Sequence, residues 1–390
     1  MSTDSADSWG IAIDSSIDEA LADLRLVDHH VHGPLRGDVT REELELLITE
    51  SDRPAPVGTQ FDSQVGFAIR AHCAPLIGLP AHASADEYWQ ERARRSAEEL
   101  TRTFLGASGT AHWLLETGYK GDQILDPQGL AALGVGRVSE VVRLESVLES
   151  VARGSAAGDL ADRFTDALAE RAASAVGLKS IVAYRYGFDF APTRPSAAEV
   201  ANAAGGWLRE IDAGADPKVV DPTLLRMLLW AGVDTGLPLQ LHTGYGDADV
   251  ELHRCDPLLL TSWLKAIEGS GTKVLLLHCY PYHRNAGYLA QVYPHVYFDV
   301  GLAVNYTGAA SPRVIAESLE LAPFSKVLYS SDAWGPPELH YLGAALWRRG
   351  TARALTAFVR DGQWAAEDAV RVADMIGRTN ALRVYGLSDE

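Results

Sequence analysis

The sequence predicts an α/β fold, a (β/α)8 TIM barrel with a helical insertion after the first strand and helices at its C-terminal end. Eight short apolar runs follow one another along the chain, and longer segments rich in Ala, Leu, Glu and Arg separate most of them. Several runs are continuously apolar rather than alternating, as expected for parallel strands covered by helices. Eight such units fill a barrel. A doubly wound open sheet is the alternative, but no GxGxxG motif follows the first run.

The chain order of these elements predicts one domain over residues 1–390, without an internal repeat or a low-complexity linker. The longest gap, between the first two strands, contains helical segments and predicts an insertion over about residues 36–110. We expect it to form a cap or lid over the barrel mouth, where loops carry function. The tail from Thr351 to Glu390 predicts closing helices. The predicted strands cover residues 24–32, 111–117, 137–145, 177–185, 237–243, 273–280, 295–302 and 326–334.

The composition restricts the partners and the compartment. The 390 residues include 34 basic and 52 acidic side chains, a formal net charge of −18 that repels nucleic acids and anionic membranes. The three cysteines are widely spaced and form no CxxC pair, which favours a reducing compartment. The polar first residues, MSTDSADSWG, lack a signal-peptide pattern, and no apolar run is long enough for a membrane helix. We therefore expect a cytoplasmic protein and a small-molecule substrate, and we also expect a homo-oligomer.

The first strand carries a histidine cluster in the segment LVDHHVHGP. Active sites of barrels lie at the C-terminal ends of the strands. Strict alternation places His30 and His32 on one face, toward the barrel mouth, with Asp28 one step deeper on that face. The same alternation turns His29 toward the helix layer.

Three later strands also end in a polar residue that can bind a metal. The fifth ends at His242, the sixth at His278 and the eighth at Asp332. A lone histidine at a strand end is more often a structural residue. Nitrogen and carboxylate groups at equivalent positions of several strands, however, are what a catalytic divalent metal needs, and their joint occurrence favours a metal site.

Four motifs resemble the amidohydrolase superfamily, namely VDHHVH, LQLHTGYGD, LLLHCYPYHRNAGYLA and LYSSDAWGPPE. They look like the amidohydrolase-related (amidohydrolase 2) family, which also contains metal-dependent decarboxylases. GLKSIVAYRYG and LHTGYGDADVELHRCDPLLL are most similar to the amidohydrolase-like domain that some proteins fuse to glutamine synthetase. The resemblance covers roughly residues 24–386.

The resemblance implies a role for each residue of the cluster. His30, His32 and His242 are then the nitrogen ligands of one divalent metal, and Asp332 both approaches the metal and transfers protons. His278 orients a water or polarises the substrate carbonyl. General chemistry agrees, because a metal lowers the pKa of a bound water and a nearby carboxylate can accept its proton. Zn²⁺ is the first expectation for a His-rich site, with Mn²⁺ as the alternative.

Lys179 bears on the number of metal ions. Two-metal relatives bridge their ions with a carboxylated lysine at the end of the fourth strand, and Lys179 is the candidate for this position. If residues 177–185 form one strand, Lys179 lies at its beginning, far from the mouth at roughly 3.3 Å per residue. This placement predicts a single metal.

Charged residues at other strand ends suggest a substrate pocket. Arg143 and Glu145 end the third strand and Arg185 ends the fourth. An arginine can hold a substrate carboxylate with two hydrogen bonds. Asp247, in the loop after the fifth strand, can receive a substrate ammonium group. Alternatively, the charged side chains pair with one another and Asp247 caps a turn.

Three functions agree with these residues. The first is a metal-dependent amidohydrolase that cleaves a C–N (amide) bond of a small carboxylate-bearing substrate through a metal-activated water. The resemblance points to a γ-glutamyl amide. The second is a metal-dependent, non-oxidative decarboxylase with the same ligands. The third is a binding or regulatory domain that keeps the metal site without turnover.

Overall fold

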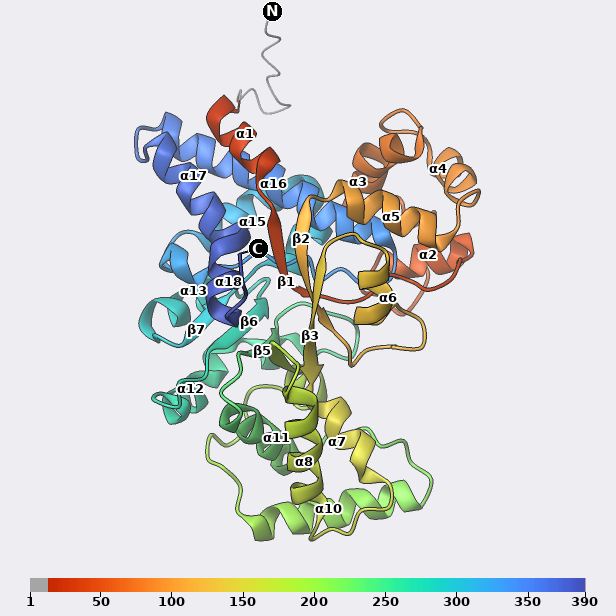
Figure 1. Cartoon of the computed structure of the whole chain (residues 1–390). Helices are drawn as coiled ribbons and strands as arrows, with labels where there is room; N and C mark the ends of the chain where they lie inside the picture. Colours follow the sequence, from red (N-terminus) through yellow and green to blue (C-terminus); the bar gives the residue numbers. More distant parts are fainter. Residues whose placement is uncertain (1–12, 390) are drawn as a thin grey trace, which may run out of the picture.

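Seven parallel strands form one sheet in the order β1 to β7 in a computed structural model that describes residues 13–389. The polar segment 1–12, on which the signal-peptide prediction depends, lies outside the described residues. Each strand pairs with the next along the chain (Figure 1). The strands are β1 (Leu26–Val31), β2 (Thr110–Glu116), β3 (Arg137–Arg143), β4 (Gly177–Ser180), β5 (Leu239–Thr243), β6 (Val274–His278) and β7 (Val296–Phe298).

An irregular eighth segment connects β7 to β1. The Leu328 N–H donates to the Phe298 carbonyl over 3.0 Å, and the His32 N–H donates to the Ala333 carbonyl over 2.9 Å. Only isolated parallel bridges form along it, so the segment 326–334 is not a regular strand. Its backbone turns left-handed at Asp332, with φ 49°, and this interrupts the ladder. The predicted eighth strand is therefore in the expected place but is not regular.

β1 contains a bulge that changes which side chains face inward. Asp28 pairs with Trp113 and Val31 pairs with Leu115, so three steps along β1 oppose two along β2. A bulge inserts one residue and breaks the alternation of faces. The prediction that His29 faces the helices is therefore wrong, because its ring lies within hydrogen-bond distance of side chains of the barrel interior.

β4 is shorter than predicted. After Ser180 the chain turns into the short helix α9 (Val182–Arg185). The Glu145 carboxylate stabilises this turn, since its Oε1 accepts hydrogen bonds from Ser180 Oγ at 2.6 Å and from the Ile181 N–H at 3.0 Å. Lys179 consequently lies one residue before the end of the strand.

The predicted insertion between β1 and β2 is helical. Figure 1 shows its helices on one side of the strands, away from the group formed by α7, α8, α10 and α11. Ser or Thr side chains cap four of them, and in three a Glu three residues after the cap completes a capping box. The elements are α2 (Arg41–Leu47), α3 (Gln64–Ala68), η1 (Ile69–Cys73), η2 (Ala74–Ile77), α4 (Ala85–Arg92) and α5 (Ala97–Ala107).

The remaining helices surround the sheet, and no helix among residues 13–389 is long and apolar enough to cross a membrane. The predicted C-terminal helices are present as α16 to α18. The series comprises α1 (Ser15–Asp23), α6 (Pro127–Ala132), α7 (Leu144–Ala152), α8 (Leu160–Ala172), α10 (Ala197–Asp212), α11 (Pro222–Asp234), α12 (Thr261–Ile267), α13 (His283–Val292), α14 (Gly301–Thr307), α15 (Ser311–Ser318), α16 (Pro337–Arg360), α17 (Ala366–Asp374) and α18 (Asn380–Tyr385).

Two apolar clusters stabilise the barrel. The larger lies between the strands and the surrounding helices. The smaller joins side chains of the barrel interior, such as Val27, Leu114 and Leu275, to Val384 and Tyr385 of α18. Because early residues of the strands contact α18, this helix closes the interior at the amino ends of the strands. The polar residues discussed below lie at the opposite ends.

A buried ion pair fixes part of the insertion to the barrel. Arg92, the last residue of α4, donates from Nε to Glu338 Oε1 over 2.6 Å, and the Tyr88 hydroxyl donates to the same oxygen over 2.9 Å. The side chains of Arg92 and Glu338 are only 5% and 0% exposed. Glu338 lies in the first turn of α16, shortly after Asp332, so this contact connects α4 to the segment that carries the site.

We predict that Arg92→Met lowers the free energy of unfolding by about 3–5 kcal/mol, because it leaves the Glu338 carboxylate buried without its cation. Adding Glu338→Leu recovers part of this loss, since two apolar side chains need no counter-ion. Urea denaturation measures both effects. The control is Arg94→Met, which removes an ion pair from a 73% exposed arginine and costs below about 1 kcal/mol. An equally small effect of Arg92→Met would contradict the prediction.

Candidate active site

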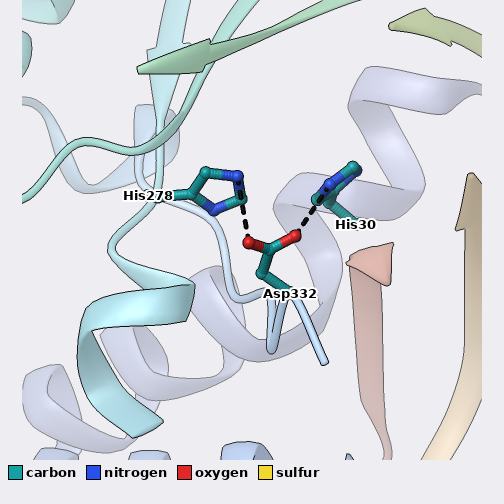
Figure 2. Close-up of side chains that lie close together, drawn as sticks. All are labelled: His30, His278 and Asp332. Carbon is teal, nitrogen blue, oxygen red and sulfur yellow. Dashed lines mark ion pairs between the residues drawn. The ribbon is translucent and has the colours of Figure 1, made fainter. Parts of the chain in front are cut away.

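Three residues from distant parts of the chain meet at the carboxyl ends of the strands. Figure 2 shows Asp332 between His30 and His278, with one carboxylate oxygen toward each ring. Oδ1 lies 3.0 Å from His30 Nε2, and Oδ2 lies 3.2 Å from His278 Nε2. One nitrogen or oxygen atom from each residue lies within 4.8 Å of the others, so the three can share one cation.

The other two predicted metal-site residues are close to this cluster. His32 Nε2 lies 3.7 Å from Asp332 Oδ1. The His242 and His278 rings are 4.9 Å apart between centroids. The fold thus brings together all five residues that the sequence indicated, although His278, for which we expected an orienting role, is in the tightest group. Which of them bind the metal stays a prediction.

Several ring nitrogens of the cluster have the state that a metal requires. His242 Nε2 and both nitrogens of His278 are buried without a hydrogen-bond partner among the described residues. The contact between His278 Nε2 and Asp332 is short, but its angle is not that of a hydrogen bond. An unpaired buried polar atom costs about 1–3 kcal/mol, and a cation would compensate for that cost. Burial also lowers the pKa of His242 and His278 well below the usual value and keeps the rings neutral. These residues fit a divalent ion.

Gln240 fixes the proton of His30. Its Nε2 donates to the His29 carbonyl over 2.7 Å, and because a carbonyl only accepts, this contact orients the amide. Gln240 Oε1 then faces His30 Nδ1 at 2.7 Å and accepts its proton. The lone pair of His30 is therefore on Nε2, the atom that faces Asp332. The neighbour of a metal-binding imidazole commonly sets its tautomer in this way.

Asp299, at the end of β7, organises the backbone beneath the cluster. Its Oδ1 accepts hydrogen bonds from the His278 N–H at 3.0 Å and from Ser330 Oγ at 2.9 Å. Its Oδ2 lies 3.0 Å from His29 Nε2. Asp299 was not among the predicted residues, because the predicted seventh strand, 295–302, extends beyond it, whereas the observed β7 ends at Phe298.

Two residues of the cluster have strained backbones. His278 has φ 66° and Asp332 has φ 49°. This left-handed conformation costs a residue other than glycine about 1–3 kcal/mol. Hydrogen bonds compensate for the strain, since the His278 N–H donates to Asp299 and the Asp332 N–H donates to the His30 carbonyl over 3.1 Å. Such strain commonly occurs at functional sites.

The predicted position of Lys179 is wrong. Its Nζ lies 3.2 Å from His30 Nε2, in the site rather than at the far end of the barrel. The cause is the early end of β4 at Ser180, which places Lys179 near the mouth. Burial lowers the pKa of Lys179 to about 8. Lys179 is therefore close to the cluster, and its position does not favour a single metal over two.

A cavity of about 800 Å³ opens above the cluster. His32, His242 and Asp332 lie in its wall together with side chains of the loops after the strands. The insertion lines it with residues of α2 and of the chain that follows, among them Leu46, Glu50 and Asp52. The insertion thus forms part of the cavity wall, and its role as a cap or lid stays a prediction.

Arg143 lines the cavity but already has a carboxylate partner. Its Nε and Nη2 donate to Glu116 Oε1 and Oε2 over 2.9 and 2.8 Å. Glu116 also lies 3.0 Å from His32 Nδ1. Burial alone would raise the pKa of Glu116, but Arg143 and His32 hold it well below the usual value. The paired charges make Arg143 part of the wall around His32.

Arg185 and Asp247 line the cavity and keep free binding capacity. Arg185 Nη2 pairs with Glu149 at 3.0 Å, whereas Nη1 is buried without a partner among the described residues. Asp247 Oδ1 accepts a hydrogen bond from the Asp249 N–H over 2.9 Å, so Asp247 caps a turn, which is one of the two roles predicted for it. Asp247 also lines the cavity.

Glu145, the remaining predicted substrate residue, is fully buried and does not line the cavity. Its hydrogen bonds to Ser180 and Ile181 hold the end of β4. Glu145 thus positions Lys179, the neighbour of Ser180, and the structure gives no support to a substrate contact.

Comparisons with known proteins identify the family of the chain. A family model described as Amidohydrolase (Amidohydro_2) matches residues 131–387. Protein fluG of Emericella nidulans is 33% identical over 262 residues, which is 65% of this chain and 29% of fluG. The chain therefore spans less than a third of that relative.

Solved structures extend the similarity to nearly the whole chain. A protein from Lactobacillus casei ATCC 334, assigned as a metal-dependent hydrolase, is 29% identical with a TM-score of 0.82, over 96% of this chain and 98% of that one. The uronate isomerase of Bacillus halodurans C-125 shares the fold alone, at 14% identity and a TM-score of 0.65 over 96% of each chain. The predicted barrel is confirmed, and the chain belongs to the amidohydrolase family, as a metal-dependent hydrolase.

Proposed function

We propose that the protein hydrolyses the C–N (amide) bond of a small, carboxylate-bearing substrate through a metal-activated water. One observation carries this proposal. The cluster of His30, Asp332 and His278 lies beside a cavity whose wall contains the unpaired Nη1 of Arg185. A γ-glutamyl amide is the first substrate class to test, because its head group has both a carboxylate and an ammonium group.

We propose one divalent ion, Zn²⁺ first and Mn²⁺ as the alternative, held by His30, His32, His242 and Asp332. Support for a single ion now comes from the one compact group of possible ligand atoms within residues 13–389, and not from the position of Lys179. The neutral imidazoles and the carboxylate suit either ion. Bound there, the ion supplies Lewis acidity and lowers the pKa of an adjacent water toward neutrality. Gln240 keeps His30 in the tautomer that binds a cation.

Asp332 is suited to move the proton. Burial raises its pKa well above the usual value, which makes this carboxylate a better proton acceptor than an exposed aspartate. It can accept the proton of the attacking water and pass it to the leaving amine. His278 faces the same carboxylate and is placed to polarise the substrate carbonyl.

The two halves of an amino-acid head group have separate partners. Arg185 Nη1 can donate to the carboxylate, and Asp247 can accept from the ammonium group. The insertion contributes Glu50 and Asp52 to the cavity wall, both close enough to interact electrostatically with Asp247. The homo-oligomeric state and the cytoplasmic location stay predictions.

We predict that the metal-loaded protein releases amine from γ-glutamyl or N-acyl amides, and that chelation removes this activity and metal addition restores it. Elemental analysis then gives one ion per chain, and a ratio of two would contradict the single-ion proposal. Aromatic and unsaturated carboxylic acids test the decarboxylase alternative in parallel. Release of CO₂ without any amine release would overturn the proposed amide hydrolysis.

We predict that Gln240→Met weakens metal binding roughly 10-fold to 100-fold, since it removes the acceptor that fixes His30. Gln240→Glu keeps an acceptor for His30 Nδ1. We therefore expect this variant to bind the metal more tightly than Gln240→Met, whatever its effect on the free energy of unfolding. Competition with a chelator measures the affinity. The control is Gln291→Met, which changes the same side chain on the exposed surface of α13. Equal affinity of the Met and wild-type proteins would refute this role of Gln240.

We predict that Arg185→Met lowers kcat/KM for carboxylate-bearing amides about 10-fold to 100-fold, the value of a charge-assisted hydrogen bond. The same variant changes little for the corresponding substrates in which the carboxylate is a carboxamide. Arg194→Met, which removes a half-exposed arginine paired with Asp234, is the matched control. A uniform loss across both substrate types would show that Arg185 acts on the fold and not on the carboxylate.

A further inference from the structure

The cavity has a second basic region that the proposed function does not use. Tyr119 and Lys120 follow β2, and Trp334 is the last residue of the eighth segment. The Tyr119 and Trp334 rings meet edge to face at 5.4 Å between centroids. Lys120 Nζ lies 4.7 Å from the centre of the Trp334 ring and 5.2 Å from that of Tyr119. The two rings thus hold the ammonium group at the rim of the cavity.

Lys120 has unused binding capacity. Its Nζ makes no ion pair or hydrogen bond with another group in the described part of the chain, whereas Lys218 on the same cavity pairs with Asp249. Its backbone is left-handed, with φ 44°. A cation–π contact leaves the ammonium protons free for an anion. Lys120 is therefore a positive charge that lacks an anionic partner.

Neighbouring groups leave the Lys120 charge uncompensated. The Arg143 guanidinium lies 5.6 Å from the centre of the Tyr119 ring, and Glu116 already balances its charge. Trp334 Nε1 is a buried donor without an acceptor among the described residues. Acidic residues of the wall gather elsewhere. Burial raises the pKa of Glu50, and the negative charge of nearby Asp247 raises it further. The Lys120 region is thus the positive end of the cavity.

The order of the strands places this region opposite the proposed head-group site. β2 and the eighth segment flank β1, whereas Arg185 and Asp247 follow β4 and β5, on the other side of an eight-membered ring. The cluster around Asp332 lies between the two sides. A substrate whose head group contacts Arg185 and whose amide lies at Asp332 therefore extends its leaving amine toward Lys120.

We propose that Lys120 is a specificity-determining residue that binds a carboxylate on the leaving amine, so that the preferred substrates are amides of amino acids. This inference rests on the proposed amide hydrolysis and extends it to the leaving-group side. Tyr119 and Trp334 position the Lys120 ammonium group.

The test compares two amides that differ only in the charge of the leaving amine. These are the γ-glutamyl amides of β-alanine and of β-alaninamide. The leaving part of the first ends in an anionic carboxylate, and that of the second ends in a neutral carboxamide. We expect wild-type kcat/KM to favour the anionic leaving group roughly threefold to fivefold, the range of an exposed ion pair. High salt reduces the preference by screening. Lys120→Gln abolishes it by slowing only the anionic substrate, and Lys120→Arg retains it.

A control variant and a binding measurement complete the test. Lys265→Gln removes an equal charge from the exposed surface of α12 and leaves the preference intact. Equilibrium binding of both amides to Asp332→Asn protein repeats the comparison without turnover. Equal affinities there, or a preference that survives Lys120→Gln, would overturn the role of Lys120. If wild-type protein hydrolyses neither amide, the proposed function fails, while the binding comparison still decides on Lys120.

Discussion

The buried carboxylate of Asp332, held between His30 and His278, constrains the rest of the barrel. A carboxylate in this position is stable only when donors or a cation surround it, because removing a charge from water is costly. Lys179 lowers its pKa, but burial is the larger effect and raises it overall. Strands β1, β4 and β6 must therefore end at matching heights around the eighth segment, so that their side chains reach the same carboxylate. The early end of β4 and the bulge in β1 meet this requirement.

A layer of paired polar groups below the site supports this arrangement. Gln240 contacts His29, His30 and Tyr385, and Asp299 connects His29 to the backbone of His278. Each group is a hydrogen-bond partner of its neighbour, and these contacts hold the geometry of the layer. Beneath it, the apolar interior and α18 exclude solvent from the amino ends of the strands. The position of the cluster thus depends on the C-terminal helix, far from it in sequence.

The sequence predicted most of what depends on periodicity and order. Apolar runs located the seven strands, the segments between and after them were expected to be helical, and the polar residues that end strands gave His30, His242, His278 and Asp332. Features that break periodicity were not accessible. A bulge in β1 reversed the expected direction of His29, and a turn held by Glu145 brought Lys179 into the site. Both depend on contacts between residues distant in sequence, which a local pattern does not contain.

The charges of the cavity suggest why the protein has this cap. Positive groups with binding capacity lie on two sides, since Arg185 beyond β4 pairs with Glu149 only through Nη2 and Lys120 beyond β2 makes no ion pair within residues 13–389. Glu50 and Asp52 of the insertion also line the cavity. A net charge of −18 repels small anions at long range, so an anionic substrate must be attracted locally. Under the proposed function, these two cations would select a ligand with charge at both ends and a neutral link in the middle. Such a ligand would place its amide beside Asp332, and the spacing of the two cations would then limit substrate length.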